Sequence, residues 1–300
     1  MNYGVIDIGS NTIRLNVYNE DRPNKEIFSK KSVAGLASYI SDGELSPRGI
    51  KKLIKVLNSH KKILNYIPVD HTYLFATASL RNVSNHKEII KNVKRETGYD
   101  IELIPDKEEA RLGYLAAGKA YDFNKGITID IGGGSTEIVA FCKGEIADVF
   151  NLSEGSLSLF SKYIDEILPG VDEYKALNKY LDSVIVPIKK LKLNGDTHAI
   201  GLGGTVRAIG NILQELHGRA VNDVYSLEDV LDLQRRIVVK DSNVLRIILQ
   251  VVPERIHTVT TGSVILSTIM KKYKVNTIYV SNIGLREGYL MNKLTEVNYD

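Results

Sequence analysis

The amino-acid sequence predicts an α/β protein of two related half-domains that face each other across a cleft. An Asp-Ile-Gly triplet occurs twice, as DIGSNTIRL at residues 7–15 and as DIGGGSTEIV at residues 130–139. Each copy follows a short β-type segment and continues through glycine and hydroxyl residues into a second β-rich segment. One such turn would most simply be a hairpin or a bulge. Two copies in the same order, about 120 residues apart, indicate a duplicated unit.

Composition is typical of a globular protein. The chain has 300 residues, of which 43% are hydrophobic and 25% charged, so two domains with substantial cores are expected and disorder is not. The formal net charge of +3, from 39 basic and 36 acidic residues, is too small to imply nucleic-acid binding. No nucleic-acid partner is expected, and an anionic ligand would have to be recognised locally.

Cysteine content and hydropathy favour a cytoplasmic protein without a membrane partner. Cys142 is the single cysteine, so no intrachain disulfide forms, and its β-rich surroundings predict a small packed side chain. The N-terminus enters a strand directly, with no basic-then-apolar leader, and no run of eighteen apolar residues occurs.

The first third of the chain predicts strands, a long helix and then alternating elements. Ser46 as cap and Pro47 at the first helical position mark the start of the helix, which is expected to end near Tyr66. A strand over residues 72–75 ends in ATASLRN at residues 76–82. The other predicted elements are strands over residues 3–6, 13–18, 26–33 and 101–104, and helices over residues 87–96 and 107–120.

The second Asp-Ile-Gly copy follows a strand over residues 126–129 and is predicted to continue as three strands through Val149. The remainder is mostly helical, interrupted by strands in THAIGLGG at residues 197–204 and NTIYVSN at residues 276–282. A boundary near residues 118–125 divides the chain into an expected N-terminal domain, 1–120, and C-terminal domain, 121–300, whose last helix could pack back on the first domain.

Polar groups suited to phosphate follow five predicted strands. Glycine lets the backbone approach a ligand so that successive N–H groups converge on an anion, and hydroxyl groups add donors. An adjacent Asp suits a hard cation such as Mg²⁺. GLGGTVRAIG also opens a helix, whose N-terminus favours an anion. Ligands bind at the carboxyl ends of strands in open α/β folds. The five segments are residues 7–11, 77–81, 130–137, 201–207 and 281–286.

This set of motifs resembles the exopolyphosphatase / guanosine pentaphosphate phosphohydrolase family, part of the sugar kinase, actin and Hsp70 superfamily. The matching segments occur in the family's order over nearly the whole chain. They are DIGSNTIRL, ATASLR, EEAR at residues 108–111, DIGGGSTE, GLGGTVRAIG, PER at residues 253–255 and GLREG at residues 284–288. The chain ends soon after GLREG, as in short members without the C-terminal HD-type extension.

The resemblance implies two ribonuclease H-like domains with a phosphoanhydride site in the cleft between them. The implied reaction removes the terminal phosphate of inorganic polyphosphate or the 5′ phosphate of guanosine pentaphosphate. Glu109 matches the residue that activates the attacking water, and Asp130 and Glu137 match positions associated with metal and water. The implied phosphate-binding turn consists of Gly132, Gly133, Gly134 and Ser135.

Other candidates come from the residues themselves. Arg81 and Arg207 follow their turns directly and are suited to forked hydrogen bonds with phosphate oxygens. Asp7 and Asp130 are the candidate ligands of Mg²⁺, with Mn²⁺ as the alternative metal. The six histidines show no metal-ligand spacing. The remaining phosphate-binding candidates are Ser10, Asn11, Gly203, Gly204 and Thr205.

Several of these residues also have structural interpretations. Asp106-x-x-Glu109 has the spacing of a capping box, so Glu109 could satisfy a helix N-terminus. Glu137 could be an outward-facing strand residue, and the arginines could form salt bridges, with Arg286-Glu287 as an interdomain ion pair. Lys189, Lys190 and Lys192 could guide a polyanion or form a solvated helix face.

The chain departs from the family pattern at Asn282, at Ile256-His257 and at Asp106-Lys107. The leading hypothesis is an exopolyphosphatase, with guanosine pentaphosphate hydrolysis as the alternative. A non-catalytic sensor of polyphosphate or guanosine tetraphosphate and a kinase on the same scaffold are further possibilities. The expected partner is the phosphorylated substrate, and a homodimer is left open.

Overall fold

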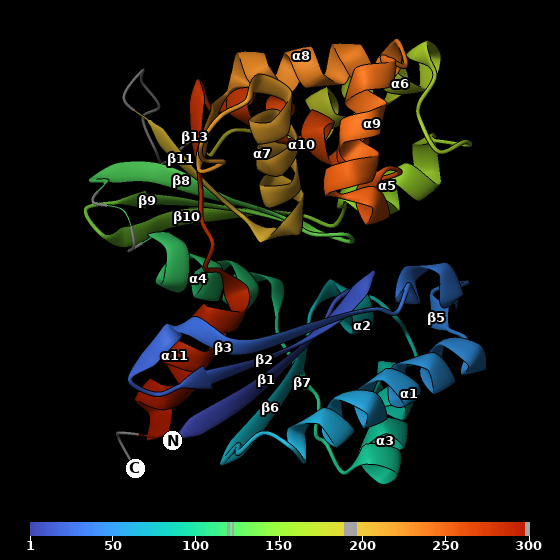
Figure 1. Cartoon of the computed structure of the whole chain (residues 1–300), viewed down its shortest axis with the longest axis vertical. Helices are drawn as coiled ribbons and strands as arrows, with labels where there is room; N and C mark the ends of the chain where they lie inside the picture. Colours follow the sequence, from blue (N-terminus) through green and yellow to red (C-terminus); the bar gives the residue numbers. More distant parts are fainter. Residues whose placement is uncertain (119–120, 122, 189–196, 298–300) are drawn as a thin grey trace. The chain divides into compact units, whose positions relative to one another are not determined.

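The computed structural model describes residues 1–118, 121, 123–188 and 197–297. The chain forms two compact units (Figure 1). Unit 1 comprises Met1–Leu112 and Leu285–Asp300, and unit 2 comprises Gly113–Gly284. The cluster of Lys189, Lys190 and Lys192 lies outside the described residues. Among the described residues, no helix combines the length and the apolar character that crossing a bilayer would require.

These units differ from the predicted ranges 1–120 and 121–300 in where they divide the chain, and they agree with the expectation that the last helix could pack back on the first domain. The division falls inside a helix, after Leu112, and the last helix belongs to unit 1. The reason is packing: Leu112 and Leu290 are buried in one apolar cluster with Phe75 and other residues of unit 1. A boundary chosen from composition misses this cluster because its members are far apart in the sequence.

Unit 1 contains a five-stranded sheet in the order β3-β2-β1-β6-β7. β1 pairs antiparallel with β2 and parallel with β6. Ile6 and Ile8, near the end of β1, have no exposed surface. A two-stranded sheet of β4 and β5 stands apart. The strands are β1 (Asn2–Ile8), β2 (Thr12–Asn19), β3 (Arg22–Val33), β4 (Ile40–Ser41), β5 (Glu44–Leu45), β6 (His71–Ala76) and β7 (Glu102–Leu103).

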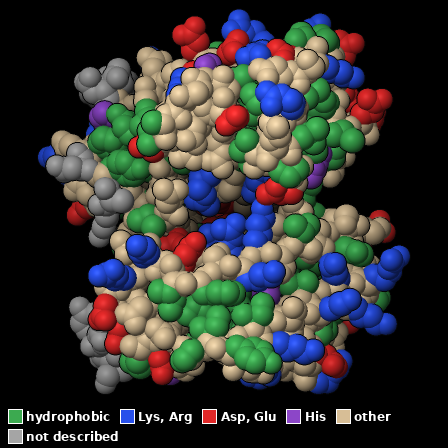
Figure 2. All heavy atoms as spheres, viewed as in Figure 1, with side chains coloured by type: hydrophobic (Ala, Val, Ile, Leu, Met, Phe, Trp, Pro, Cys, Tyr) green, Lys and Arg blue, Asp and Glu red, His purple; other side chains and the backbone are tan. Residues whose placement is uncertain are grey.

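Helix α1 (Pro47–Leu64) begins as predicted, because the Ser46 hydroxyl accepts a hydrogen bond from the Gly49 N–H and Pro47 occupies the first turn. Its apolar face packs into the core through Leu53 and Leu57. Figure 2 shows Lys and Arg side chains gathered over the part of unit 1 where α1 lies in Figure 1. The other helices that begin in unit 1 are a 3₁₀ helix (Leu36–Tyr39), α2 (Ala78–Arg81), α3 (His86–Thr97), α4 (Asp106–Ala117) and α11 (Leu285–Val297).

Unit 2 contains a six-stranded sheet in the order β10-β9-β8-β11-β13-β12. β8 pairs antiparallel with β9 and parallel with β11. The strands are β8 (Lys125–Ile131), β9 (Thr136–Cys142), β10 (Glu145–Leu152), β11 (His198–Leu202), β12 (Val224–Ser226) and β13 (Thr277–Val280).

The core of unit 2 is closed by helices, of which α10 (Val259–Lys272) is the most central. Twelve consecutive residues of α10, from Val259 to Met270, are buried. The Ser and Thr hydroxyls in this segment mostly bond to carbonyls of the preceding turn, which satisfies them without water. The remaining helices are α5 (Ser156–Tyr163), α6 (Val171–Val184), α7 (Gly203–His217), α8 (Leu227–Val238), α9 (Ser242–Val251) and a 3₁₀ turn (Pro253–Arg255).

The two sheets repeat one plan, as the duplicated triplet predicts. In both, the strand that carries the Asp lies between an antiparallel neighbour that follows it directly and a parallel neighbour that comes later in the chain. The orders β3-β2-β1-β6 and β10-β9-β8-β11 therefore correspond. The predicted α/β class with a duplicated unit is confirmed. Helix α2, strands β4 and β5, and strand β12, each of two to four residues, were not predicted.

Candidate functional site

The glycine turn of unit 2 connects β8 to β9 and is held against the start of helix α5. The Gly132 carbonyl accepts hydrogen bonds from the Ser156 N–H at 2.9 Å and from the Ser156 hydroxyl at 3.1 Å. The Gly133 carbonyl accepts from the N–H groups of Leu157 and Ser158, both at 2.9 Å. Donors that a helix N-terminus normally leaves unsatisfied are used here to fix the turn.

This attachment sets the direction of the N–H groups in the turn. In a trans peptide the carbonyl of one residue and the N–H of the next point in opposite directions. Because the carbonyls of Gly132 and Gly133 point to α5, the N–H groups of Gly133 and Gly134 point away from it. Neither N–H has a hydrogen-bond partner among the described residues. Successive N–H groups of this kind form an anion-binding concavity.

Helix α7 begins beside Asp130, the acidic residue of the second Asp-Ile-Gly copy. Gly203, its first residue, has φ +79°, and a Cβ there would lie 2.2 Å from the Asp130 Oδ1 atom. A Cβ on Gly204 would lie 2.1 Å from the Arg255 Nη2 atom. The positive φ of Gly203 therefore favours glycine, whereas a side chain at Gly204 would have to displace the Arg255 guanidinium. The carboxylate and the guanidinium both lie against the first turn of α7, whose free N–H groups favour an anion.

Arg255 was not among the residues singled out from the sequence as ligands. It lies at the end of the PER segment, which the family resemblance marked without assigning it a role. Its guanidinium lies against the first turn of α7, which the Asp130 carboxylate also approaches. Because a guanidinium can bind phosphate oxygens, we add Arg255 to Gly203 and Gly204 as a candidate phosphate contact. The neighbouring His257 packs edge-on against Phe160 at 5.2 Å, and burial, with Arg255, lowers its pKa.

Asp130 and Glu137 are direct cross-strand partners in the β8–β9 pair. Residues opposite each other in an antiparallel pair project from the same face with their Cβ atoms about 5 Å apart. Glu137 is only 3% exposed. Two carboxylates this close fit a divalent cation that also keeps waters and phosphate oxygens as ligands. No group of three or more His, Cys, Asp or Glu side chains within the described ranges is arranged to hold a metal without such additional ligands.

Thr205 and Arg207 lie further along α7. Thr205 is 3% exposed, and its Oγ1 atom has no hydrogen-bond partner in the part of the chain that the structure describes. The Arg207 guanidinium donates to the Ser281 carbonyl at 3.0 Å, so it connects α7 to the end of β13. This contact is compatible with a structural role, which the sequence alone left as an alternative.

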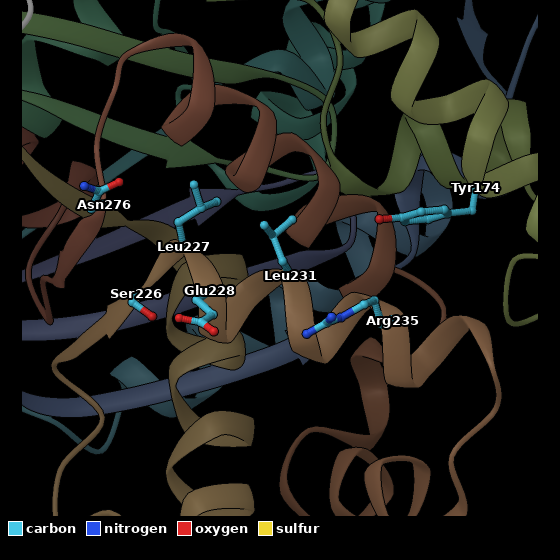
Figure 3. Close-up of a pocket in the computed structure, with 7 residues that line it drawn as sticks. All are labelled: Tyr174, Ser226, Leu227, Glu228, Leu231, Arg235 and Asn276. Atoms are coloured by element: carbon cyan, nitrogen blue, oxygen red, sulfur yellow. The ribbon is translucent and has the colours of Figure 1, made fainter.

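A separate pocket in unit 2 contains none of the predicted residues. It has a volume of about 580 Å³ and lies beside the start of α8 (Figure 3). Leu227 and Leu231 form its apolar part, and Tyr174, Glu228 and Arg235 its polar part. The Tyr174 hydroxyl donates to Gln234 at 2.8 Å, so this group is already satisfied. The pocket contains no cluster of groups suited to phosphate.

In unit 1, the Asp of the first Asp-Ile-Gly copy forms an ion pair with an arginine. The Arg286 Nη1 atom lies 3.1 Å from the Asp7 Oδ2 atom, and the two side chains are 15% and 19% exposed. Burial alone would lower the pKa of Arg286, but Asp7 and Glu287 outweigh burial and raise it. The position that a metal would take beside Asp7 is thus held by a guanidinium. The residues of this turn do not fit the metal site predicted on Asp7.

The following residue, Glu287, is buried beside the same turn. The Tyr18 hydroxyl donates to Glu287 Oε1 at 2.5 Å, and Asn16 donates to the Tyr18 oxygen at 3.0 Å. Arg286 and Glu287 thus bind residues of β1 and β2 within unit 1. The interdomain ion pair that was one alternative for Arg286-Glu287 does not describe these contacts.

Ser10 and Asn11 form the turn after β1. Their carbonyls accept from backbone N–H groups of residues 34–37, which fixes the turn. The Ser79 hydroxyl donates to the Ile8 carbonyl and connects α2 to the end of β1. The side chains of Ser10 and Asn11 are partly exposed and have no hydrogen-bond partner among the described residues. They remain candidate ligands.

Glu109 lies in the first turn of α4 and forms an ion pair with Arg81. The Arg81 Nη1 atom donates to the Glu109 Oε2 atom at 2.9 Å and to the Ile104 carbonyl at 2.6 Å. Arg81 also pairs with Asp106, one of the residues that depart from the family pattern. Glu109 is 9% exposed. Arg81, predicted as a phosphate ligand, here orients the carboxylate of Glu109.

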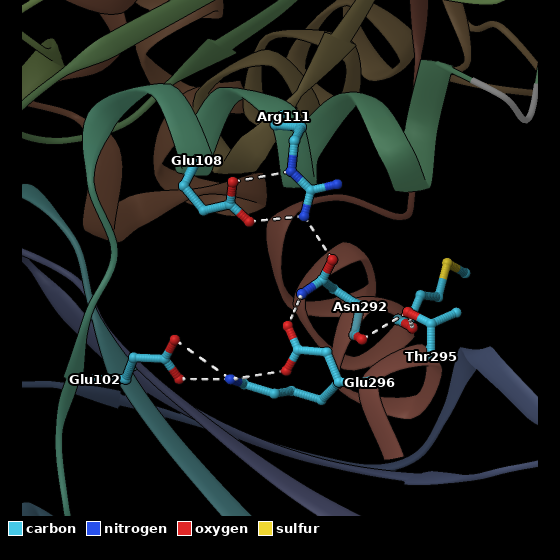
Figure 4. Close-up of polar contacts among 8 residues, drawn as sticks. Glu102, Glu108, Arg111, Asn292, Thr295 and Glu296 are labelled. Carbon is cyan, nitrogen blue, oxygen red and sulfur yellow. Dashed lines mark hydrogen bonds and ion pairs between the residues drawn. The ribbon is translucent and has the colours of Figure 1, made fainter. Parts of the chain in front are cut away.

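Helix α4 contacts α11, which in turn contacts β7 (Figure 4). Arg111 donates to Glu108 at 2.7 Å and also to Asn292. Lys293 lies 3.1 Å from Glu102 and 3.4 Å from Glu296. These contacts connect the helix that carries Glu109 to the last helix of the chain.

The comparisons with known proteins agree with the motifs. The model of the Ppx/GppA phosphatase family matches residues 20–297. The chain belongs to the Ppx/GppA phosphatase family. A curated relative is exopolyphosphatase 1 of Mycobacterium tuberculosis, which is 25% identical over 307 residues that cover 98% of this chain and 88% of the relative.

Solved structures of two similar proteins align with this chain over nearly its whole length. An exopolyphosphatase from Cytophaga hutchinsonii is 26% identical, with a TM-score of 0.86 over 99% of this chain and 98% of that chain. The Aquifex aeolicus member of the Ppx/GppA family is 25% identical, with a TM-score of 0.78 over 100% and 99% of the two chains. Membership of the family implies dependence on a divalent metal.

Proposed function

We propose that this protein is an exopolyphosphatase, which hydrolyses the terminal phosphoanhydride bonds of inorganic polyphosphate. The observation that carries the proposal is the glycine turn of unit 2, which α5 holds so that the Gly133 and Gly134 N–H groups stay available for an anion. Family membership and the exopolyphosphatases among the relatives support the same function.

Phosphate binding is assigned to unit 2. The N–H groups of the turn at residues 132–135 and of the first turn of α7 donate to phosphate oxygens. Arg255, beside Gly204, adds a fixed positive charge. Phosphoryl transfer to water depends mainly on positioning and charge neutralisation, and these groups supply both.

Asp130 and Glu137 would hold the divalent metal, for which Mg²⁺ is proposed and Mn²⁺ is the alternative. Their cross-strand pairing fits a cation with few protein ligands, whereas Asp7 is occupied by Arg286. When bound, the ion neutralises charge on phosphate oxygens. We do not assign Asp7 as a metal ligand.

Glu109 is proposed as the general base. It takes a proton from water as the water oxygen bonds to the terminal phosphorus. The bond from that phosphorus to the bridging oxygen breaks, and its electron pair goes to the shortened chain. A positioned base of this kind contributes roughly 10²–10⁴-fold to the rate, or about 3–5 kcal/mol. Arg81 holds the carboxylate in one orientation through its contact at 2.9 Å.

The test is phosphate release by the purified protein with Mg²⁺, comparing Glu109→Gln with Glu108→Gln. Glu108 is the matched control because it is the adjacent residue and pairs with Arg111 on the same helix. We expect Glu109→Gln to lower turnover by about 10²–10⁴-fold and to keep polyphosphate binding, and Glu108→Gln to change turnover less than about threefold. Equal turnover in both variants would remove Glu109 from the mechanism.

The same assay with guanosine pentaphosphate tests the alternative substrate, and faster release from it would assign the chain to that reaction. Binding of polyphosphate without any release by the native protein would identify a sensor instead of a hydrolase. A cytoplasmic location and a homodimer remain predictions, which cell fractionation and light scattering would test.

A further inference from the structure

The outer face of helix α1 carries a continuous row of positive charge. At 100° per residue, the side chains of five basic residues fall within an arc of about 100°. These residues, called the α1 stripe below, are Arg48, Lys51, Lys52, Lys55 and Lys62. They extend over fourteen residue steps, or about 21 Å along the helix axis at 1.5 Å per residue. Figure 2 shows basic side chains gathered over this part of unit 1.

No acidic residue balances the α1 stripe. The sequence of α1 contains no Asp or Glu. Among the described residues, no carboxylate lies within ion-pair distance of any member of the stripe. Helix α8 differs, because it has three acidic residues and pairs Arg235 with Asp232 at 3.0 Å. The positive charge of α1 is therefore directed to solvent.

This arrangement destabilises the helix by itself. Arg48 and Lys52 are like charges at i and i+4, as are Lys51 and Lys55, and each pair costs about 0.2–0.5 kcal/mol. Arg48 also lies in the first turn, where the helix dipole disfavours a cation. A bound anion would remove both costs.

The apolar face of α1, opposite the stripe, is packed in the protein core and is not available to insert into a membrane. Ile50, Leu53 and Leu57 lie about 180° from the centre of the stripe and are buried in the core of unit 1. The helix has no free apolar face to bury in a bilayer. The stripe also lacks an aromatic residue on which nucleobases could stack. A linear polyanion without bases or acyl chains is the partner that fits.

We propose that the α1 stripe binds inorganic polyphosphate along its length and holds the part of a long chain that is away from the reacting end. This inference rests on the proposed exopolyphosphatase function for the identity of its ligand. It predicts that long polyphosphate binds more tightly than triphosphate, because only a long chain engages the stripe and the reacting site together.

The test uses a variant in which Lys51, Lys52, Lys55 and Lys62 are all replaced by Gln. Gln and Lys have similar helix propensity, so the fold is expected to survive, and thermal denaturation followed by circular dichroism checks this. A matched control removes the same charge from exposed lysines of unit 2 by replacing Lys179, Lys240, Lys271 and Lys274 with Gln.

Two readouts separate the stripe from the reacting site. Release of phosphate is measured with triphosphate and with polyphosphate of about 100 units. Binding of end-labelled polyphosphate is measured by fluorescence anisotropy at several salt concentrations. For the stripe variant, we expect KM and Kd for long polyphosphate to rise about tenfold or more, with kcat and the constants for triphosphate unchanged. The slope of log Kd against log salt should fall by about 3, by analogy with about 0.7 per contact for single-stranded nucleic acid.

The outcomes for the two proposals differ. If long polyphosphate binds the native protein and the stripe variant equally, or if the control variant loses as much affinity, the stripe is not the binding surface. Tighter binding of polyuridylate or of anionic phospholipid vesicles than of polyphosphate to the stripe would overturn its assignment to polyphosphate. Absence of phosphate release by the native protein would instead refute the proposed function, and the anisotropy measurement would still decide whether the stripe binds polyphosphate.

Discussion

Replacing Gly155 by alanine tests whether α5 holds the glycine turn in its binding conformation. A Cβ at this position would lie 2.5 Å from the Gly132 oxygen and 2.6 Å and 2.7 Å from the Gly133 carbon and oxygen. Gly155 has φ −133° and ψ −172°, which any residue can adopt, so the cost comes from this contact alone. To reach an ordinary contact distance of 3.4 Å, the atoms of the turn would have to move by about 0.7–0.9 Å.

Such a movement weakens the four hydrogen bonds that α5 donates to Gly132 and Gly133. At about 0.5–1.5 kcal/mol net for each bond, complete loss of all four would cost about 2–6 kcal/mol. Because the bonds are weakened and not all broken, the expected loss in the free energy of unfolding is about 2–4 kcal/mol. For a unit of this size, that corresponds to a fall in Tm of roughly 5–15 °C. The displaced N–H groups should also raise KM for polyphosphate about tenfold.

Gly170→Ala is the matched control, measured by calorimetry and by the same phosphate-release assay. Gly170 also immediately precedes a helix, but its nearest potential contact is a flexible Glu173 carboxylate at 3.5 Å, so it shares the capping effect without the clash. Equal Tm values for the two variants within about 1 °C, together with an unchanged KM, would refute the role assigned to α5.

Three further predictions concern buried groups of unit 1. His60 is fully buried, and burial lowers its pKa from 6.5 to about 4. Its contribution to the free energy of unfolding is therefore fully present above pH 6.5 and is lost as the pH falls to about 4. We expect urea denaturation to show a loss of about 1–3 kcal/mol over this range, and His60→Gln should reduce that loss. Arg286→Met leaves Asp7 without its ion pair and should cost about 3–5 kcal/mol by the same method, whereas adding Asp7→Asn should restore part of the loss. Tyr18→Phe removes the hydroxyl that donates to Glu287 and should lower the free energy of unfolding by about 1.5–3 kcal/mol, and an unchanged free energy of unfolding would show that this hydrogen bond is not stabilising.

Sequence reasoning predicted the elements that depend on local patterns. Ser46 and Pro47 predict the start of α1 because capping involves residues within one turn of each other. The alternation of strands and helices in both halves likewise predicts the duplicated sheet plan. The end of α1 was predicted at Tyr66 and lies at Leu64, where no strong stop signal occurs.

Side-chain contacts could be predicted less well, because the partners come from distant parts of the chain. Arg81 stays a candidate phosphate ligand, but its contact with Glu109, 28 positions later, was not predicted. The importance of Gly155 could not be predicted, since its only signal is the close approach of the turn at Gly132 and Gly133. Arg255 could have been found, because a basic residue in a family motif was already marked.

The sequence by itself determined that the protein has two copies of a strand–turn–strand unit, with acid, glycine and hydroxyl residues in the order that a phosphate site requires. These properties follow from residues adjacent in the chain, whose spacing sets the period of each element and the conformation of each turn. Only the tertiary structure determined which charged side chains form ion pairs. Arg286 is 279 positions from Asp7, and their ion pair was not predicted. Such a contact depends on how α11 packs on unit 1, and local sequence patterns carry no information about packing between elements so far apart.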